Sequence, residues 1–344
     1  MTASITFIGD TLLGGDAQET LDREGYARAF DGLAPLLSDT DLVVANHEGP
    51  ITRADRHSAK GYNDGKKRRW YRARPESVQT LVEAGVGVVS LANNHVLDFG
   101  LEGLADTVGS LDAAGISHCG AALDVRDAYR PAVVTVGGYR IAFLSYMQRY
   151  DIYTRDDVYA SPEHGGVARL TAGRIREDLD ALADADLRVV LVHWGRTYKP
   201  VTSLQKELAA RLREAGADLV IGHHSHTAHG VDLSERCPVL FSLGNGTFGT
   251  RGRFEKKGSP PYGLLARVEI DGARSISGIE IRLLHVDNYE VGYRPVPADD
   301  AAAGEFVWSL VSPEQGWRQV EPGVLRAGLA ARTRVEPEID RRRL

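Results

Sequence analysis

The sequence predicts an α/β fold from three observations: alternating segments, the placement of glycine and proline, and one hairpin. Short apolar runs alternate with stretches of helical periodicity, which is typical of sheets covered by helices. Pro75 suits the first turn of a helix, and Gly85 and Gly216 stand where helices commonly end. Gly137 and Gly138 separate two apolar runs and predict a tight turn. The sheet is therefore expected to be mixed.

The predicted elements follow one another along most of the chain. In order, the strand runs are SITFI, LVVA, VGVVSL, AVVTV, RIAFLS, RVVLV, LVI and VLFS, at residues 4–8, 42–45, 86–91, 132–136, 140–145, 188–192, 219–221 and 239–242. Helices are expected over residues 26–37, 75–84, 101–114, 172–185 and 203–215. No internal repeat or linker divides the chain. We predict one main domain, residues 1–295, and a charged, alanine-rich appendage, residues 296–344.

Composition excludes several classes of function. The chain has 344 residues, 43% of them hydrophobic, and a formal net charge of −6, which argues against a partner that is nucleic acid. No run approaches the ~18 apolar residues of a membrane anchor, and the amino terminus does not resemble a secretory signal. Two distant cysteines, Cys119 and Cys237, form no disulfide framework. We expect a cytoplasmic protein, and the sequence does not indicate its oligomeric state.

Polar side chains follow six of the predicted strands directly. The carboxyl ends of parallel strands meet at one edge of a sheet, where open α/β folds place their chemistry. The residues concerned are Asp10; Asn46, His47 and Glu48; Asn93, Asn94, His95 and Asp98; His193; His223, His224, His226 and His229; and Asn245. One carboxylate after a strand is often only a helix cap, but capping does not explain convergence of all six.

The chemistry of these side chains predicts a metal-dependent hydrolase. Imidazoles mixed with carboxylate and amide oxygens, without thiolates, suit Mn²⁺, Zn²⁺ or Fe. A carboxylate can bridge two such ions ~3.5–4 Å apart, and a histidine that binds no metal can protonate a leaving group. The alternatives are a buried structural histidine at His193, a solvated loop carboxylate at Glu48, and plain turn residues at Asn94 and His95.

The order of motifs resembles a known family. GD, NxE, NNHxxDxG, HWG, GHHxH and SLGN occur in succession over roughly residues 4–250. This order is similar to that of the CapA (poly-γ-glutamate biosynthesis) family, which belongs to the calcineurin-like metallophosphatase superfamily. The resemblance implies a four-layer αββα sandwich with mixed sheets and a site for two divalent metal ions at the strand ends.

The resemblance also implies a role for each residue of the site. It makes Asp10 and His226 ligands of the first metal, with Glu48 as the bridge between the two ions. The second metal would be held by Asn94, His193 and His224, beside His95 as general acid and Asp98 as the group that orients it. Residues expected to support the ligands are Asn46, His223 and Asn245.

Three departures from the family pattern bear on the site. Leu12 stands where most members of the superfamily have a histidine ligand, so we expect the first metal site to be weak. Glu48 replaces the usual bridging aspartate. Thr197, in HWGRTY, stands where CapA-like sequences commonly have glutamate, which predicts a different choice of substrate.

Two basic segments, residues 53–74 and 250–262, are predicted loops. Such segments are usually only solvated. The alternative for the first is a lid in which Arg72 or Arg74 grips the phosphate or carboxylate of a small anionic substrate.

Three functions remain open. The first is hydrolysis of a phosphoester by a metal-bound hydroxide, with His95 protonating the leaving oxygen. The second is metal-assisted hydrolysis, transfer or formation of an amide, peptide or γ-glutamyl bond. The third is a non-catalytic subunit of a biosynthetic complex, which Leu12 would permit.

Overall fold

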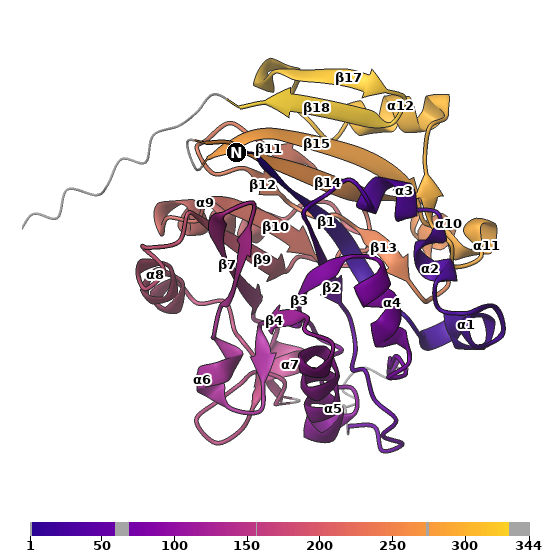
Figure 1. Ribbon diagram of the computed structural model, residues 1–344, viewed down its shortest axis with the longest axis vertical. Helices are drawn as coiled ribbons and strands as arrows, with labels where there is room; N and C mark the ends of the chain where they lie inside the picture. The colour runs from indigo at the N-terminus through magenta and orange to yellow at the C-terminus, as the bar shows by residue number, and fades with distance from the viewer. Residues whose placement is uncertain (1, 59–68, 156, 273–274, 330–344) are drawn as a thin grey trace, which may run out of the picture.

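The computed structural model describes residues 2–58, 69–155, 157–272 and 275–329 (Figure 1). Residues 59–68 of the predicted lid and residues 330–344 of the predicted appendage lie outside these ranges. Two sheets form the centre of the fold. The larger contains β1 (Ala3–Leu12), β2 (Leu42–His47), β3 (Val86–Ser90), β4 (Ser117–Cys119), β13 (Asn245–Phe248), β14 (Tyr262–Ile270), β15 (Ile276–His285), β16 (Val296–Pro297), β17 (Trp317–Glu321) and β18 (Val324–Gly328).

The large sheet is mixed, as the family resemblance implies. Its strands run in the order β17-β18-β15-β14-β1-β2-β3-β4, with β13 beside β1 and β16 beside β15. Strands β1 to β4 are parallel, and β14 joins the outer side of β1 in antiparallel pairing. The carboxyl ends of β1 and β2, where Asp10 and Glu48 stand, are therefore neighbours in space.

The second sheet contains β6 (Ala132–Val136), β7 (Tyr139–Met147), β9 (Leu187–His193), β10 (Leu219–His223), β11 (Val231–Asp232) and β12 (Val239–Leu240). Its order is β11-β12-β10-β9-β7-β6, with parallel pairing from β7 through β12. The hairpin predicted at Gly137 and Gly138 joins β6 to β7, and both glycines have positive φ. A small third sheet pairs β5 (Ala121–Ala122) with β8 (Gly166–Val167).

Helices pack against the two sheets. They are α1 (Gln18–Glu24), α2 (Arg28–Asp31), α3 (Ala34–Leu37), α4 (Ser77–Glu83), α5 (Gly100–Ala113), α6 (Val125–Ala128), α7 (Asp151–Arg155), α8 (Ala172–Asp180), α9 (Ser203–Glu214), α10 (Phe254–Lys257), α11 (Asn288–Val291) and α12 (Ala301–Trp308), with 3₁₀ turns η1 (Gly15–Ala17) and η2 (Pro313–Gln315). None of the helices in the described part of the chain has the length and apolar character needed to span a bilayer.

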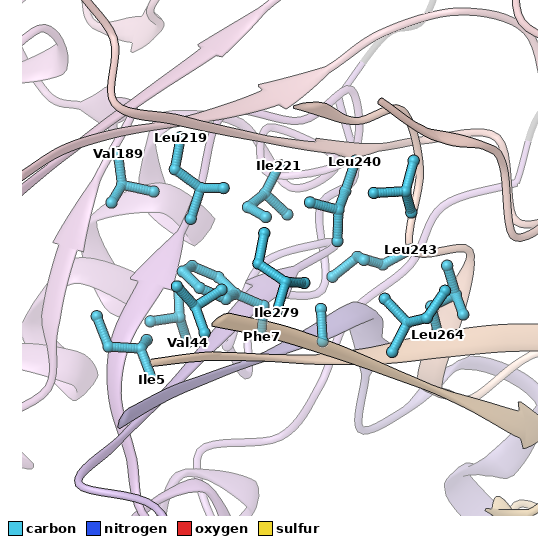
Figure 2. Close-up of a cluster of buried hydrophobic side chains, with 14 of the residues drawn as sticks. Ile5, Phe7, Val44, Val189, Leu219, Ile221, Leu240, Leu243, Leu264 and Ile279 are labelled. Carbon is cyan, nitrogen blue, oxygen red and sulfur yellow. The ribbon is translucent and has the colours of Figure 1, made fainter. Parts of the chain in front are cut away.

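Three apolar clusters define four layers. Between the sheets, side chains such as Phe7 and Val44 of the large sheet face Ile221 and Leu240 of the second (Figure 2). A second cluster joins the large sheet to α1 through α5, and a third joins the second sheet to α8 and α9. The αββα sandwich implied by the resemblance is therefore confirmed.

The segment after residue 295 packs against the large sheet. Strand β18 pairs with β15, and β17 pairs with β18 (Figure 1). Side chains of this segment, including Val307, Trp317 and Leu325, belong to the cluster between the sheets. The predicted domain boundary at residue 295 stays a prediction.

A bulge at the end of β1 determines where Asp10 points. The pairing of β1 with β2 shifts register between Ile8 and Asp10, so Gly9 is the extra residue. A Cβ atom on Gly9 would lie 2.2 Å from the carbonyl oxygen of Gly244, which precedes β13. Because Gly9 has no side chain, β13 can approach β1 closely. Asp10 and Asn245 are then paired in the sheet.

Gly9→Ala is expected to destabilise the fold by ~1–3 kcal/mol, because β13 must move away to admit the methyl group. Gly109→Ala is the matched control. Gly109 lies exposed in α5, and the space that a methyl group would occupy there is open, so alanine is expected to stabilise by ~0.5–1 kcal/mol. Chemical denaturation of both variants measures the two effects, and equal stability of Gly9→Ala and wild type would contradict this account of the bulge.

Candidate metal centre

Strand ends from both sheets meet at one place. Asp10 lies near the end of β1, and Glu48 directly follows β2 in the large sheet. His193 ends β9 and pairs in register with His223, which ends β10. The predicted convergence of polar side chains is therefore present, and it joins the facing edges of two sheets.

Five of these side chains form two overlapping groups. Glu48, His193 and His224 make one group, and Asp10, Glu48 and His226 make the other. Within each group the ligand atoms lie within 4.8 Å of one another, and all five residues are buried. Glu48 is common to both groups, and the family resemblance implies a bridging role for it. Their role as metal ligands stays a proposal.

Asn94 adjoins the group that contains His193. Its Oδ1 lies 2.7 Å from Nε2 of His193. The loop that carries Asn94 is fixed by Asn93, whose amide donates to the carbonyl of His47 and whose Oδ1 accepts from the backbone of His95. Hydrogen bonds of a buried asparagine thus hold the NNH turn in place.

Unpartnered polar atoms show that these residues fit a metal. Among the described residues, neither carboxylate oxygen of Glu48 has a hydrogen-bond partner, and Nδ1 of His193 and of His224 also lack one. His193 Nε2 lies 3.5 Å from Glu48 Oε1 without forming a hydrogen bond. Buried polar atoms normally have partners. A divalent cation would provide them here.

Burial sets the charge states of the group. Burial, and then the negative charges of Asp10 and Asp98, raise the pKa of Glu48 well above its usual range. Burial also lowers the pKa of His193 and takes that of His224 to about 3. Both imidazoles are therefore neutral at physiological pH, which is the form that binds metal.

Asp10 is held as an anion by its neighbours. Burial would raise its pKa, but contacts with His223 and His226 outweigh it and hold the pKa well below the usual range. Nδ1 of these histidines lies 3.5 and 3.3 Å from the Asp10 carboxylate, and the amide of Asn46 donates to it at 2.9 Å. The predicted supporting residues Asn46 and His223 thus lie against Asp10. Asn245, the third, has its Oδ1 2.9 Å from Nδ1 of His226.

The turn after β10 has an unusual backbone. His224 and His226 both have positive φ, at 90° and 60°, which is uncommon for residues other than glycine. The backbone N–H of His224 points at the Asp10 carboxylate, 3.3 Å away, and the carbonyl of Ser225 accepts a hydrogen bond from the backbone N–H of Tyr198. Backbone strain of this kind persists only where surrounding contacts enforce it, and it often marks a functional site.

His95 stands beside the two groups and is paired with a carboxylate. Its Nδ1 lies 2.8 Å from Oδ2 of Asp98, which also accepts the backbone N–H of Tyr71 at 2.6 Å. The ring of Tyr71 packs on His95 with 4.4 Å between centroids. The His95 side chain is 15% exposed, whereas that of Asp98 is fully buried. The predicted orienting contact between His95 and Asp98 is present.

The arginines predicted to grip substrate contact other groups. The guanidinium of Arg72 lies over the ring of Phe99 and 3.3 Å from Asp55. That of Arg74 pairs with Asp22 at 2.9 Å. Within the described part of the chain, neither guanidinium forms an ion pair with the two groups. Their role in binding an anion stays a prediction.

Comparison with known proteins identifies the family. Residues 4–250 match the family described as bacterial capsule synthesis protein PGA_cap. The chain belongs to this family. The resemblance seen in the sequence is thereby confirmed over the range in which its motifs occur.

Three relatives of this PGA_cap family member illustrate the similarity. The capsule biosynthesis protein CapA of Bacillus anthracis is 31% identical over 251 residues, which are 71% of this chain and 59% of that protein. The PGA biosynthesis protein CapA of Bacillus subtilis (strain 168) is 28% identical over 71% of this chain and 63% of that protein. A probable polyglutamine synthesis accessory protein of Mycobacterium tuberculosis is 35% identical over 60% of this chain and 55% of that protein. The chain therefore spans about three fifths of the length of these relatives.

Aromatic rings around the PGA_cap centre were not predicted from the sequence. Phe248 and Tyr198 lie 4.8 and 5.8 Å from the ring of His226, and Tyr150 lies 5.4 Å from that of His224. Tyr198 shares the motif HWGRTY with His193, and Tyr71 belongs to the motif YRAR. These motifs were the available signal in the sequence.

Proposed function

We propose that this PGA_cap family member is a hydrolase that uses two divalent ions, Mn²⁺, Zn²⁺ or Fe, to cleave a phosphoester in a small anionic substrate. Glu48 carries the proposal. Its carboxylate is fully buried, neither oxygen has a hydrogen-bond partner among the described residues, and it belongs to two separate groups of ligand type. A buried, unpaired carboxylate is costly unless a cation compensates it.

The two groups divide the ligands between the ions. Asp10, Glu48 and His226 would hold the first ion, and Glu48, Asn94, His193 and His224 would hold the second. When bound, such a pair lowers the pKa of coordinated water, orients the substrate and offsets negative charge in the transition state. Leu12 offers no ligand, so we expect the first ion to bind more weakly than the second.

His95 would supply the proton for the leaving group. Asp98 accepts a hydrogen bond from Nδ1 of His95, and this contact fixes both the ring and the tautomer. The proton that reaches the substrate would then come from Nε2. Tyr71 packs on the same ring, so the imidazole is held between a carboxylate and an aromatic face. A fixed donor of this kind is suited to general acid catalysis.

The names of the relatives favour a second candidate function. They describe capsule, PGA and polyglutamine synthesis, which suggests an amide, peptide or γ-glutamyl bond as the bond that is hydrolysed, transferred or formed. The same ligands would serve it, because two ions polarise a carbonyl as they do a phosphoryl group.

A paired assay tests the proposal. Protein stripped with a chelator and reloaded with Mn²⁺ or Zn²⁺ is given p-nitrophenyl phosphate and, separately, γ-glutamyl-p-nitroanilide. We expect metal-dependent release of p-nitrophenol from the phosphoester, lost on chelation and restored on reloading. Turnover of the γ-glutamyl substrate alone would favour the second candidate. Full metal occupancy without turnover of either compound would contradict both and favour a non-catalytic subunit.

A further inference from the structure

The second basic loop brings a cation to the rim of the metal centre. Arg253 directly precedes α10 in this loop. Its guanidinium carbon lies 5.6 Å from the centre of the Tyr198 ring, and its backbone N–H donates to the Tyr198 hydroxyl at 3.3 Å. Two contacts with one tyrosine therefore position this arginine.

Tyr198 is itself part of the centre. It is buried, its ring is 5.8 Å from that of His226, and its backbone has a φ of 55°, which is rare for an aromatic residue. Its N–H donates to the carbonyl of Ser225, inside the turn that carries His224 and His226. Tyr198, which positions Arg253, is thus anchored to the turn that carries His224 and His226.

The charge of Arg253 also acts on Tyr71, whose ring packs on His95. Burial raises the pKa of Tyr71 to about 12, and it raises the pKa of Tyr198, while the positive charge of Arg253 opposes both shifts. Its charge therefore acts on the ring that packs on His95 and on the ring beside His226. Both tyrosines keep their hydroxyl protons at neutral pH.

Arg69, Arg72 and Arg74 have carboxylate partners, whereas Arg253 has none within the described ranges. Arg69 pairs with Asp16, and the two arginines of the YRAR motif pair with aspartates of their own. No carboxylate of the described residues lies within 4.0 Å of the Arg253 guanidinium. A guanidinium placed against an aromatic face, without an anionic partner, is suited to receive an anion from outside.

We propose that Arg253, positioned by Tyr198, binds an anionic group of the substrate at the rim of the metal centre. The guanidinium offers two parallel N–H donors, which match two oxygens of a phosphate or a carboxylate. The Tyr198 hydroxyl accepts from the Arg253 backbone and can donate its own proton to the same anion. This inference rests on the proposed function only in taking the substrate to be anionic.

Calorimetric titration of inorganic phosphate into metal-loaded protein tests the proposal without requiring turnover. Arg253→Ala is expected to raise the dissociation constant for phosphate at least ~10-fold. The dissociation constant of Arg253→Lys is expected to lie between those of Arg253→Ala and wild type, because lysine keeps the charge but lacks the two parallel N–H donors of arginine. Lys257→Ala is the matched control. It removes the same charge from the exposed end of α10 and is expected to leave phosphate binding unchanged. Parallel titrations with acetate show whether Arg253 selects phosphate or carboxylate.

The outcomes separate this inference from the proposed hydrolysis. Wild-type affinity for phosphate and acetate in Arg253→Ala would overturn it, as would an equal loss in Lys257→Ala, which would indicate only general attraction by positive charge. Failure of both anions to bind the metal-loaded wild type would overturn it too. Phosphate or acetate binding that depends on Arg253, in a protein without turnover, would leave the rim site standing and contradict the hydrolase. Turnover with an unchanged KM in Arg253→Ala would support the hydrolase and overturn the rim site.

Discussion

Glu48→Gln is expected to abolish binding of the metal pair while leaving the fold intact. The substitution keeps the size and shape of the side chain but removes the charge shared by both groups of ligands. An amide can offer one neutral oxygen, whereas a bridge between two cations requires a carboxylate. In the metal-free protein, the substitution also removes a carboxyl whose ionisation is opposed by burial and by the negative charges of Asp10 and Asp98. Metal-free Glu48→Gln should therefore unfold at a temperature no lower than metal-free wild type.

Thermal unfolding with and without Mn²⁺ or Zn²⁺ measures this effect. A ligand at 100 times its dissociation constant stabilises the folded state by ~2.7 kcal/mol, so the wild type should gain several degrees on loading. Glu48→Gln should gain almost nothing. Glu83→Gln, which changes an exposed carboxylate on α4, should respond to metal as the wild type does. Equal gains in Glu48→Gln and the wild type would show that the ions bind elsewhere.

His95→Ala is expected to lower turnover by a factor of ~10²–10⁴ while both ions stay bound, because general acid catalysis contributes about that much. His224→Ala should instead lose the second ion, since His224 belongs to the group formed with Glu48 and His193. Elemental analysis and rates on the same preparations separate the two effects. Loss of metal in His95→Ala, or wild-type rates in both variants, would contradict the assignment.

A second histidine–aspartate pair offers the control. His118 lies on β4 with Nε2 3.1 Å from Asp112, which resembles the contact of His95 with Asp98. This pair belongs to neither group of ligands in the described structure. His118→Ala should therefore keep both its metal and its rate. A large loss of rate there would mean that His95→Ala reports general damage to the fold.

The site was largely predictable because strand ends are visible in a sequence. Asp10, Glu48 and His193 each follow a short apolar run, and parallel strands bring such positions together. The assignment of these side chains to two groups came from family resemblance. In the structure, the side chains of each group lie close together. The supporting contacts of Asn245 depend on β13 pairing with β1 across more than 200 residues. Spacing along the chain contains no signal for that pairing.

The missed parts of the fold have physical reasons. Strands β14 and β15 were not predicted. They pair with each other over a short sequence separation, and each also pairs with a strand that is more distant in sequence, β1 for β14 and β18 for β15. The single helix predicted over residues 26–37 is the two helices α2 and α3. A Cβ atom on Gly32 would meet the carbonyl of Pro295, and Pro35 lies in the first turn of α3, where proline is tolerated.

The rim of the centre was hardest to predict. Arg72 and Arg74 have long side chains, and each has a nearby aspartate partner that the sequence pattern does not reveal. Tyr198 approaches His226 only because its backbone adopts a positive φ, for which the sequence has no glycine as a signal. Arg253 reaches the centre through Tyr198. Such side-chain placement follows from tertiary packing.

Anomalous X-ray diffraction from crystals soaked in Mn²⁺ tests the central claim most directly. We expect two peaks per chain, one on each side of the Glu48 carboxylate. One should lie among Asp10, Glu48 and His226, and the other among Glu48, His193 and His224. Absence of peaks at saturating Mn²⁺, a single peak, or peaks away from Glu48 would contradict a metal pair bridged by this residue.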